Sequence, residues 1–77
     1  MDRVILLERL AEAERRLAES EQKIAHQREI IADLEAAGRG RSQTVKTARE
    51  LLRTMERAQR ARMAYCEGLR LMLSRNG

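Results

Sequence analysis

Apolar side chains recur every seven residues in the first half of the chain. One row of this pattern consists of Leu10, Leu17, Ile24 and Ile31. A second row, half a heptad away, consists of Leu6, Ala13, Ser20, Gln27 and Leu34. Two rows at this offset lie on one side of a helix and face a partner along its whole length. The pattern predicts one long helix over about residues 2–37, with Asp2 as its N-cap.

The second half of the chain repeats this pattern. One row consists of Val45, Leu52, Gln59, Cys66 and Leu73, and the other of Ala48, Met55, Arg62 and Leu69. Gly38 stands where a helix commonly ends in a left-handed residue, and Ser42 and Thr44 are both candidates for the next N-cap. We therefore predict an all-α fold with a single domain over 1–77, an antiparallel hairpin with a loop at 38–43 and a second helix over about 44–74.

The length of the chain implies that the hairpin has a further partner. At 77 residues, with no Phe or Trp, no disulfide framework and no metal motif, two helices bury little surface by themselves. Both apolar stripes are about three positions in seven wide, which is typical of a helix with two neighbours. We expect a homodimer that forms a four-helix bundle. Its expected core residues are Leu6, Leu10, Leu17, Ile24, Ile31, Leu34, Ala48, Leu52, Met55 and Leu69.

Polar residues interrupt the apolar rows near the middle of each helix. They are Ser20 and Gln27 in the first half and Gln59 and Arg62 in the second. In a hairpin that turns near Gly40, Arg62 is expected beside Ser20, and Gln59 near Glu21. Because other registers would leave a guanidinium buried without a partner, we interpret this polar layer as setting the register and the oligomeric state.

Charge differs between the two halves. Residues 1–38 carry six Lys or Arg and nine Asp or Glu, whereas residues 39–77 carry ten and three, so the halves have net charges of −3 and +7. Opposite signs favour the two helices lying side by side. On the second helix one face carries Lys46, Arg49, Arg53, Arg57 and Arg60. This row is about 21 Å long, enough to meet several phosphates, so it is a candidate nucleic-acid surface; the alternative is a solvated face.

Catalytic and metal chemistry is not expected. His26 and Cys66 are too far apart along a hairpin to act as base and nucleophile, and His26 does not follow a Glu at the spacing that builds di-iron bundles. We predict no enzyme activity and no cofactor. The apolar cluster at residues 4–7 is too short for a membrane span or a signal sequence, so we expect a cytoplasmic protein that does not bind a membrane.

Two stretches resemble a family of short helical-hairpin proteins that recurs in alphaproteobacteria, especially rhizobia. They are AEAERRLAESEQKIAHQREIIADLE, residues 11–35, and TARELLRTMERAQ, residues 47–59. The run around Ile24, Ile30 and Ile31 is the most recognisable part. The resemblance implies a bacterial helical hairpin and no particular activity.

We predict a non-enzymatic homodimeric bundle with a scaffolding or regulatory role in protein–protein interaction. Two alternatives stay open: an RNA-binding dimer that uses the basic face of the second helix, and a subunit that binds a different protein through its apolar stripe.

Overall fold

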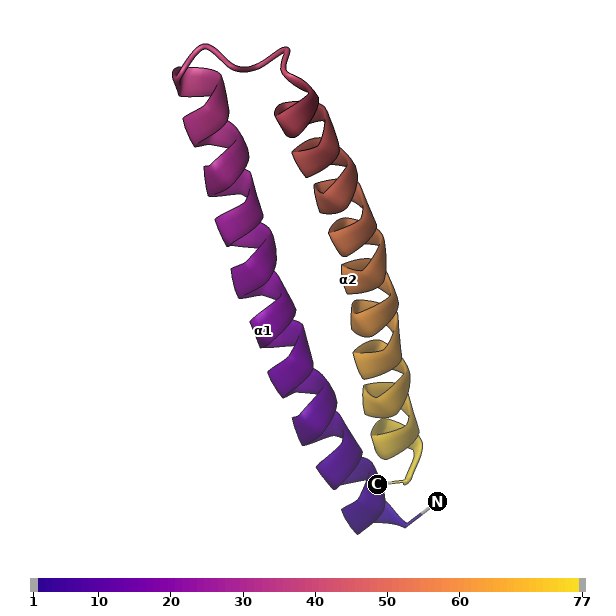
Figure 1. The fold of residues 1–77 in the computed structure, drawn as a ribbon. Coiled ribbons are helices and arrows are strands. Elements are labelled where there is room, and N and C mark those ends of the chain that lie inside the picture. Colours follow the sequence, from indigo (N-terminus) through magenta and orange to yellow (C-terminus); the bar gives the residue numbers. More distant parts are fainter. Residues whose placement is uncertain (1, 77) are drawn as a thin grey trace.

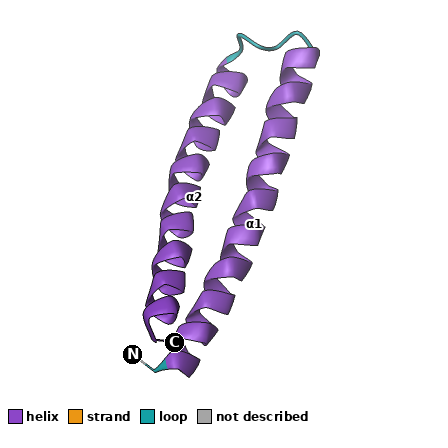
Figure 2. Ribbon diagram, turned by 180° about the vertical axis from the view of Figure 1, so that it is seen from behind, coloured by secondary structure: helices purple, strands orange, loops and turns teal. Residues whose placement is uncertain are grey.

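The computed structural model describes residues 2–76 as two long helices joined by one loop. Helix α1 comprises Arg3–Ala36 and helix α2 comprises Gln43–Asn76. The chain reverses direction in the loop, so the two termini lie together at the opposite end (Figure 1). The predicted antiparallel helical hairpin is therefore confirmed. The described residues contain two helices and no strand (Figure 2).

Each helix begins and ends at a residue suited to that place. The carboxylate of Asp2 accepts a hydrogen bond from the Val4 amide at 3.2 Å, as expected of an N-cap. At the other end Gly38 has a φ of 77°, in the left-handed region that glycine adopts without steric cost. The Ser42 hydroxyl accepts a hydrogen bond from the Val45 amide at 3.2 Å and so caps α2. The six-residue loop between the helices therefore has a helix-ending glycine near its start and a helix-capping serine at its end.

The molecule is a rod that measures 54 × 15 × 13 Å. Its radius of gyration is 17.1 Å, whereas a compact domain of this length has about 11.5 Å. Two helices make one seam, and their remaining faces are exposed. Every surface outside that seam is therefore available to a partner or to solvent.

Candidate interaction surfaces

The seam between the helices is densest toward the open end of the hairpin. Leu6, Ala13, Cys66 and Leu69 are buried together, with Leu10, Leu17 and Leu73 packed against them. Farther along, Ile24, Ile31 and Val45 are also buried. The remaining predicted core residues are half-buried: Leu34, Ala48, Leu52 and Met55. The apolar rows thus face each other, and part of their surface stays exposed on the single chain.

Two glutamines are buried in the seam, and they differ in their hydrogen bonding. Gln27 is 8% exposed, and its Nε2 donates a hydrogen bond to the Ala48 carbonyl at 3.0 Å. Gln59 is 9% exposed, and its Oε1 is buried without a hydrogen-bond donor. Gln59 lines the same hollow as Glu21, near the position that the hairpin register predicts. Only one of the two amides is fully accommodated, so Gln59 is a point of local instability.

The other two members of the polar layer lie at the edge of the seam. Arg62 is beside Ser20, with its Nη1 3.5 Å from the Ser20 hydroxyl. Arg62 is exposed and Ser20 is half-buried. The guanidinium therefore keeps its hydration in the single chain, and the burial that was expected to make it register-setting is not present there.

One edge of the hairpin carries a row of ion pairs between the helices. The pairs are Glu14 with Arg70 at 3.1 Å, Arg28 with Glu56 at 3.0 Å and Glu35 with Arg49 at 3.0 Å. Their positions are multiples of seven residues apart on both helices. The same spacing places Met63 opposite Glu21, where no ion pair forms. This row of pairs, the ion-pair edge, was not predicted, although the heptad spacing of its charges could have revealed it.

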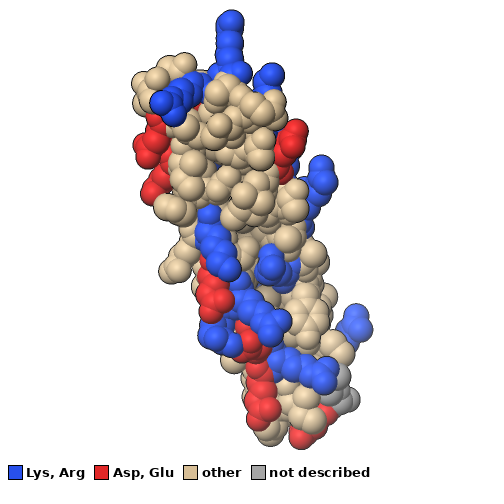
Figure 3. Space-filling model, viewed as in Figure 1, with Lys and Arg blue, Asp and Glu red and all other residues tan. Residues whose placement is uncertain are grey.

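A further ion-pair cluster lies within α1. Arg15 and Arg16 both donate hydrogen bonds to the Glu12 carboxylate, with Arg16 Nε 2.9 Å from Oε1. The bond from Arg15 is the main cause that lowers the pKa of Glu12 below its usual 4.5, and the bond from Arg16 adds to it. The Glu12 bond likewise raises the pKa of Arg15. Acidic and basic side chains are interleaved over the lower half of the face in Figure 3, whereas in its upper half the charged side chains lie along the edges around an uncharged centre.

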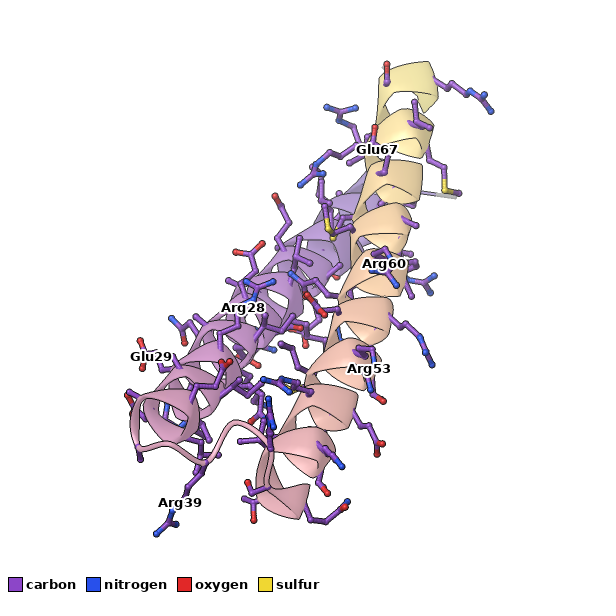
Figure 4. All side chains as sticks on the ribbon, turned by 90° about the horizontal axis from the view of Figure 1, so that it is seen from above. Arg28, Glu29, Arg39, Arg53, Arg60 and Glu67 are labelled. Carbon is purple, nitrogen blue, oxygen red and sulfur yellow. The ribbon has the colours of Figure 1, made fainter. Side chains whose placement is uncertain are left out.

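The predicted basic face is only partly intact. Arg49 is half-buried and is occupied by Glu35, with its Nη1 also 3.5 Å from the Gly40 carbonyl. The other four members are exposed and make no ion pair with any residue in 2–76: Lys46, Arg53, Arg57 and Arg60. Figure 4 labels Arg53 and Arg60 one heptad apart along α2, and Arg39 where it extends from the loop. Four unpaired positive charges thus follow one side of α2.

A second apolar stripe runs along α2, on a different side from the seam. Leu51, Tyr65 and Met72 are 50%, 53% and 44% exposed. The α2 stripe consists of these residues, Ala58, and the small residues Thr47, Thr54, Ala61 and Gly68. Most of its residues directly precede a seam residue, so it lies about 100° round the helix axis from the seam. That angle is typical of a helix with two neighbours in a four-helix bundle.

The α2 stripe borders hollows between the two helices. One large hollow has a volume of about 530 Å³ and lies between Ala61 and Tyr65 on one side and Glu12 and Arg16 on the other. A second hollow of about 320 Å³ follows it along the stripe, beside Ala58. Both are open grooves whose walls are side chains of α1 and α2. Their walls on the α1 side are largely charged, and Arg16 borders both.

Residues that could carry chemistry are dispersed. His26 is exposed, with its Nδ1 3.9 Å from Glu29 Oε2, and Cys66 is a buried free thiol in the seam. Among residues 2–76 no three His, Cys, Asp or Glu side chains come close enough together to hold a metal ion. Neither described helix is long and apolar enough to cross a bilayer. The features that stand out are surfaces: the ion-pair edge, the basic face and the α2 stripe.

Comparison of the chain with models of protein families, with curated proteins and with solved structures gave no match in any of the three. The resemblance to alphaproteobacterial hairpin proteins therefore stays a prediction that rests on the two quoted stretches of sequence.

Proposed function

We propose that this chain is a non-enzymatic, self-associating helical module, a homodimer of hairpins that forms a four-helix bundle and serves a scaffolding or regulatory role through protein–protein contacts. The observation that carries the proposal is the surface of the single hairpin. It exposes 5819 Å², whereas a compact monomer of 8.9 kDa exposes about 4,800 Å². The excess is about 1,000 Å² per chain.

The size of this excess matches the needs of a stable dimer. A standard protein interface buries about 800 Å² on each partner. Part of the exposed surface is strongly apolar, since Leu51, Tyr65 and Met72 are each close to half exposed. Pairing two hairpins removes such side chains from water. This burial stabilises the dimer by about 25 cal/mol of free energy for each Å² of apolar surface buried. A second copy is always present, so it is the simplest partner that supplies this surface.

The test is the molar mass in solution, measured by light scattering behind gel filtration over a range of concentrations. The expected mass is twice that of the 8.9 kDa chain. A mass of one chain at every concentration would contradict the homodimer. In that case the exposed stripe would point to the alternative, a subunit that binds a different protein, and affinity capture of a stoichiometric partner would be the next measurement.

The unpaired charges on α2 favour a second candidate function, the binding of nucleic acid. Lys46, Arg53, Arg57 and Arg60 are exposed, and the neighbouring Glu56 is already neutralised by Arg28 at 3.0 Å. Four phosphate contacts give a dependence of log K on log salt of about −2.8 for a single strand. Affinity for a labelled RNA should therefore fall by about 50-fold between 50 and 200 mM salt.

Replacement of Arg53, Arg57 and Arg60 with Gln tests this candidate by fluorescence anisotropy. The triple variant should keep its molar mass and lose the salt-dependent RNA affinity. A matched control is the replacement of Arg3, Arg9 and Lys23 with Gln, which removes the same charge from exposed residues of α1. Equal loss of affinity in both variants, or no binding of RNA by the unaltered protein at 50 mM salt, would refute a specific role of the basic face.

A further inference from the structure

The two rows of the α2 stripe differ in the size of their side chains. Leu51, Tyr65 and Met72 all belong to one row, together with Ala58. The other row contains only small residues: Thr47, Thr54, Ala61 and Gly68. A Cβ built on Gly68 would meet no atom within 4 Å, so the surface there is open to a side chain from outside. The stripe therefore offers both protruding side chains and places to receive them.

An antiparallel partner matches this division. When one helix of a facing pair is reversed, a side chain from the row of large residues lies level with a residue from the row of small residues on the other helix. The hairpin's own seam shows this arrangement. There Ala13, from the α1 row that contains Leu6 and Leu34, clusters with Cys66, from the α2 row that contains Val45 and Leu73. In a parallel pair each residue would meet its own copy, so Tyr65 would meet Tyr65 while Gly68 would face Gly68 across a gap. Such a gap loses packing contacts.

The position of the stripe on α2 defines the register. It begins at Thr47 and ends at Met72, four residues inside either end of the helix. We propose that, within the homodimer suggested above, α2 packs through this stripe against the partner's α2, antiparallel and with the two helices fully overlapped. Tyr65 then lies on the partner's Thr54, Leu51 on the partner's Gly68 and Met72 on the partner's Thr47.

This register also keeps apart the like charges that flank the stripe. Full overlap places Arg62 beside the partner's Met55 and away from the partner's Arg62. A shift of one heptad would bring the two Arg62 side chains together, and facing like charges are unfavourable. The basic face lies on another side of α2, so Arg53, Arg57 and Arg60 stay exposed in the dimer. Self-association and nucleic-acid binding therefore use separate surfaces.

The partner's α1 is a poorer occupant of the stripe than its α2. On α1 the charged side chains that border the large hollow are Glu8, Arg9, Glu12 and Arg16, beside the single apolar residue Ala13. Packing these groups against Leu51 and Tyr65 would remove their hydration without supplying a partner for each charge, which is costly. The exposed large apolar residues of α1 lie toward its two ends: Val4, Ile5, Leu7 and Ile30. The middle of one stripe is therefore best covered by the other stripe.

A pair of matched substitutions tests the surface. Tyr65 and Met63 are both 53% exposed and lie two residues apart on α2, but only Tyr65 is in the stripe. Tyr65→Glu should shift the dimer dissociation constant by at least 100-fold toward monomer. It should leave the helix content unchanged in circular dichroism, because residue 65 is exposed and lies outside the seam. Met63→Arg, which places a guanidinium opposite Glu21 on the ion-pair edge, should leave the dimer intact.

Disulfide mapping tests the direction of pairing. In the proposed register Thr47 of one copy is level with Met72 of the other, whereas the two Thr47 residues are about 37 Å apart. A mixture of Thr47→Cys and Met72→Cys proteins in glutathione redox buffer should yield the mixed disulfide dimer, and Thr47→Cys alone should not cross-link. Cys66 is buried and serves as the internal control for unspecific oxidation.

The outcomes separate this inference from the proposed function. If the unaltered protein is monomeric, both are overturned. If it is dimeric but Tyr65→Glu stays dimeric, or if Met63→Arg dissociates equally, the dimer stands and the stripe is the wrong surface. Efficient cross-linking of Thr47→Cys alone would show a parallel pair and overturn the antiparallel arrangement.

Discussion

Replacement of Gln59 with an apolar residue should stabilise this protein. The Gln59 side chain is buried in the seam at 9% exposure, and its Oε1 has no hydrogen-bond donor. A buried acceptor without a donor costs about 1–3 kcal/mol, because it loses its bond to water and gains none in return. Leu has a similar size and no polar atom. Gln59→Leu should therefore raise the free energy of unfolding by about 1–3 kcal/mol.

The matched control is Gln27→Leu on the opposite helix. Gln27 is buried to the same degree but donates a hydrogen bond to the Ala48 carbonyl at 3.0 Å. Its replacement removes a made bond, worth about 1 kcal/mol, and adds apolar surface in exchange. We expect a change between no effect and a loss of about 1 kcal/mol, of opposite sign to the effect at Gln59.

Urea unfolding followed by circular dichroism measures both variants, at one fixed protein concentration because association contributes to apparent stability. For a chain of this size each kcal/mol corresponds to about 4–8 °C in Tm. The light-scattering mass should be measured alongside, since a polar layer can also select the oligomeric state. Destabilisation by Gln59→Leu, or equal effects of the two substitutions, would refute the assignment of Gln59 as an unsatisfied buried amide.

Three further predictions concern the loop and the charged edges. Gly38→Ala should destabilise the hairpin by about 1–2 kcal/mol in urea unfolding, because only the φ of Gly38 is left-handed, whereas Gly40→Ala should have little effect. Met63→Arg should complete the ion-pair edge and add no more than about 0.5 kcal/mol, a gain that should vanish in 1 M salt. Because Arg15 lowers the pKa of Glu12, the ion pair stabilises α1 above pH 4.5 and is lost as pH falls through the lowered value; NMR titration of the carboxyl carbon should show this, and an unshifted pKa would contradict it.

The sequence determined the hairpin because its signals are local and repeated. A heptad spacing held over each half predicts a long helix with one apolar side, and Asp2 and Gly38 are suited to the two ends of the first. The observed helix, Arg3–Ala36, lies within one residue of the predicted range at each end. Ser42 and Thr44 were both candidates for the next cap, and the structure selects Ser42. Local rules do not separate two good caps that are two residues apart.

The candidate surfaces depended on tertiary structure to different degrees. The basic residues of α2 were identified from the sequence as a row, but the loss of Arg49 to Glu35 at 3.0 Å depends on how the helices meet. Likewise the unequal hydrogen bonding of the two glutamines follows from what lies across the seam: Gln27 Nε2 reaches the Ala48 carbonyl, whereas no donor reaches Gln59 Oε1. A pattern that repeats every seven residues assigns both to the seam and treats them alike.

The sequence by itself determined that two helices form and which side of each is apolar. These properties follow from short-range periodicity along the chain. Only the tertiary structure decided which charges pair across the hairpin and which side of α2 stays uncovered. Those outcomes depend on the rotation and axial offset of one helix against the other, set by the packing of the whole seam at once.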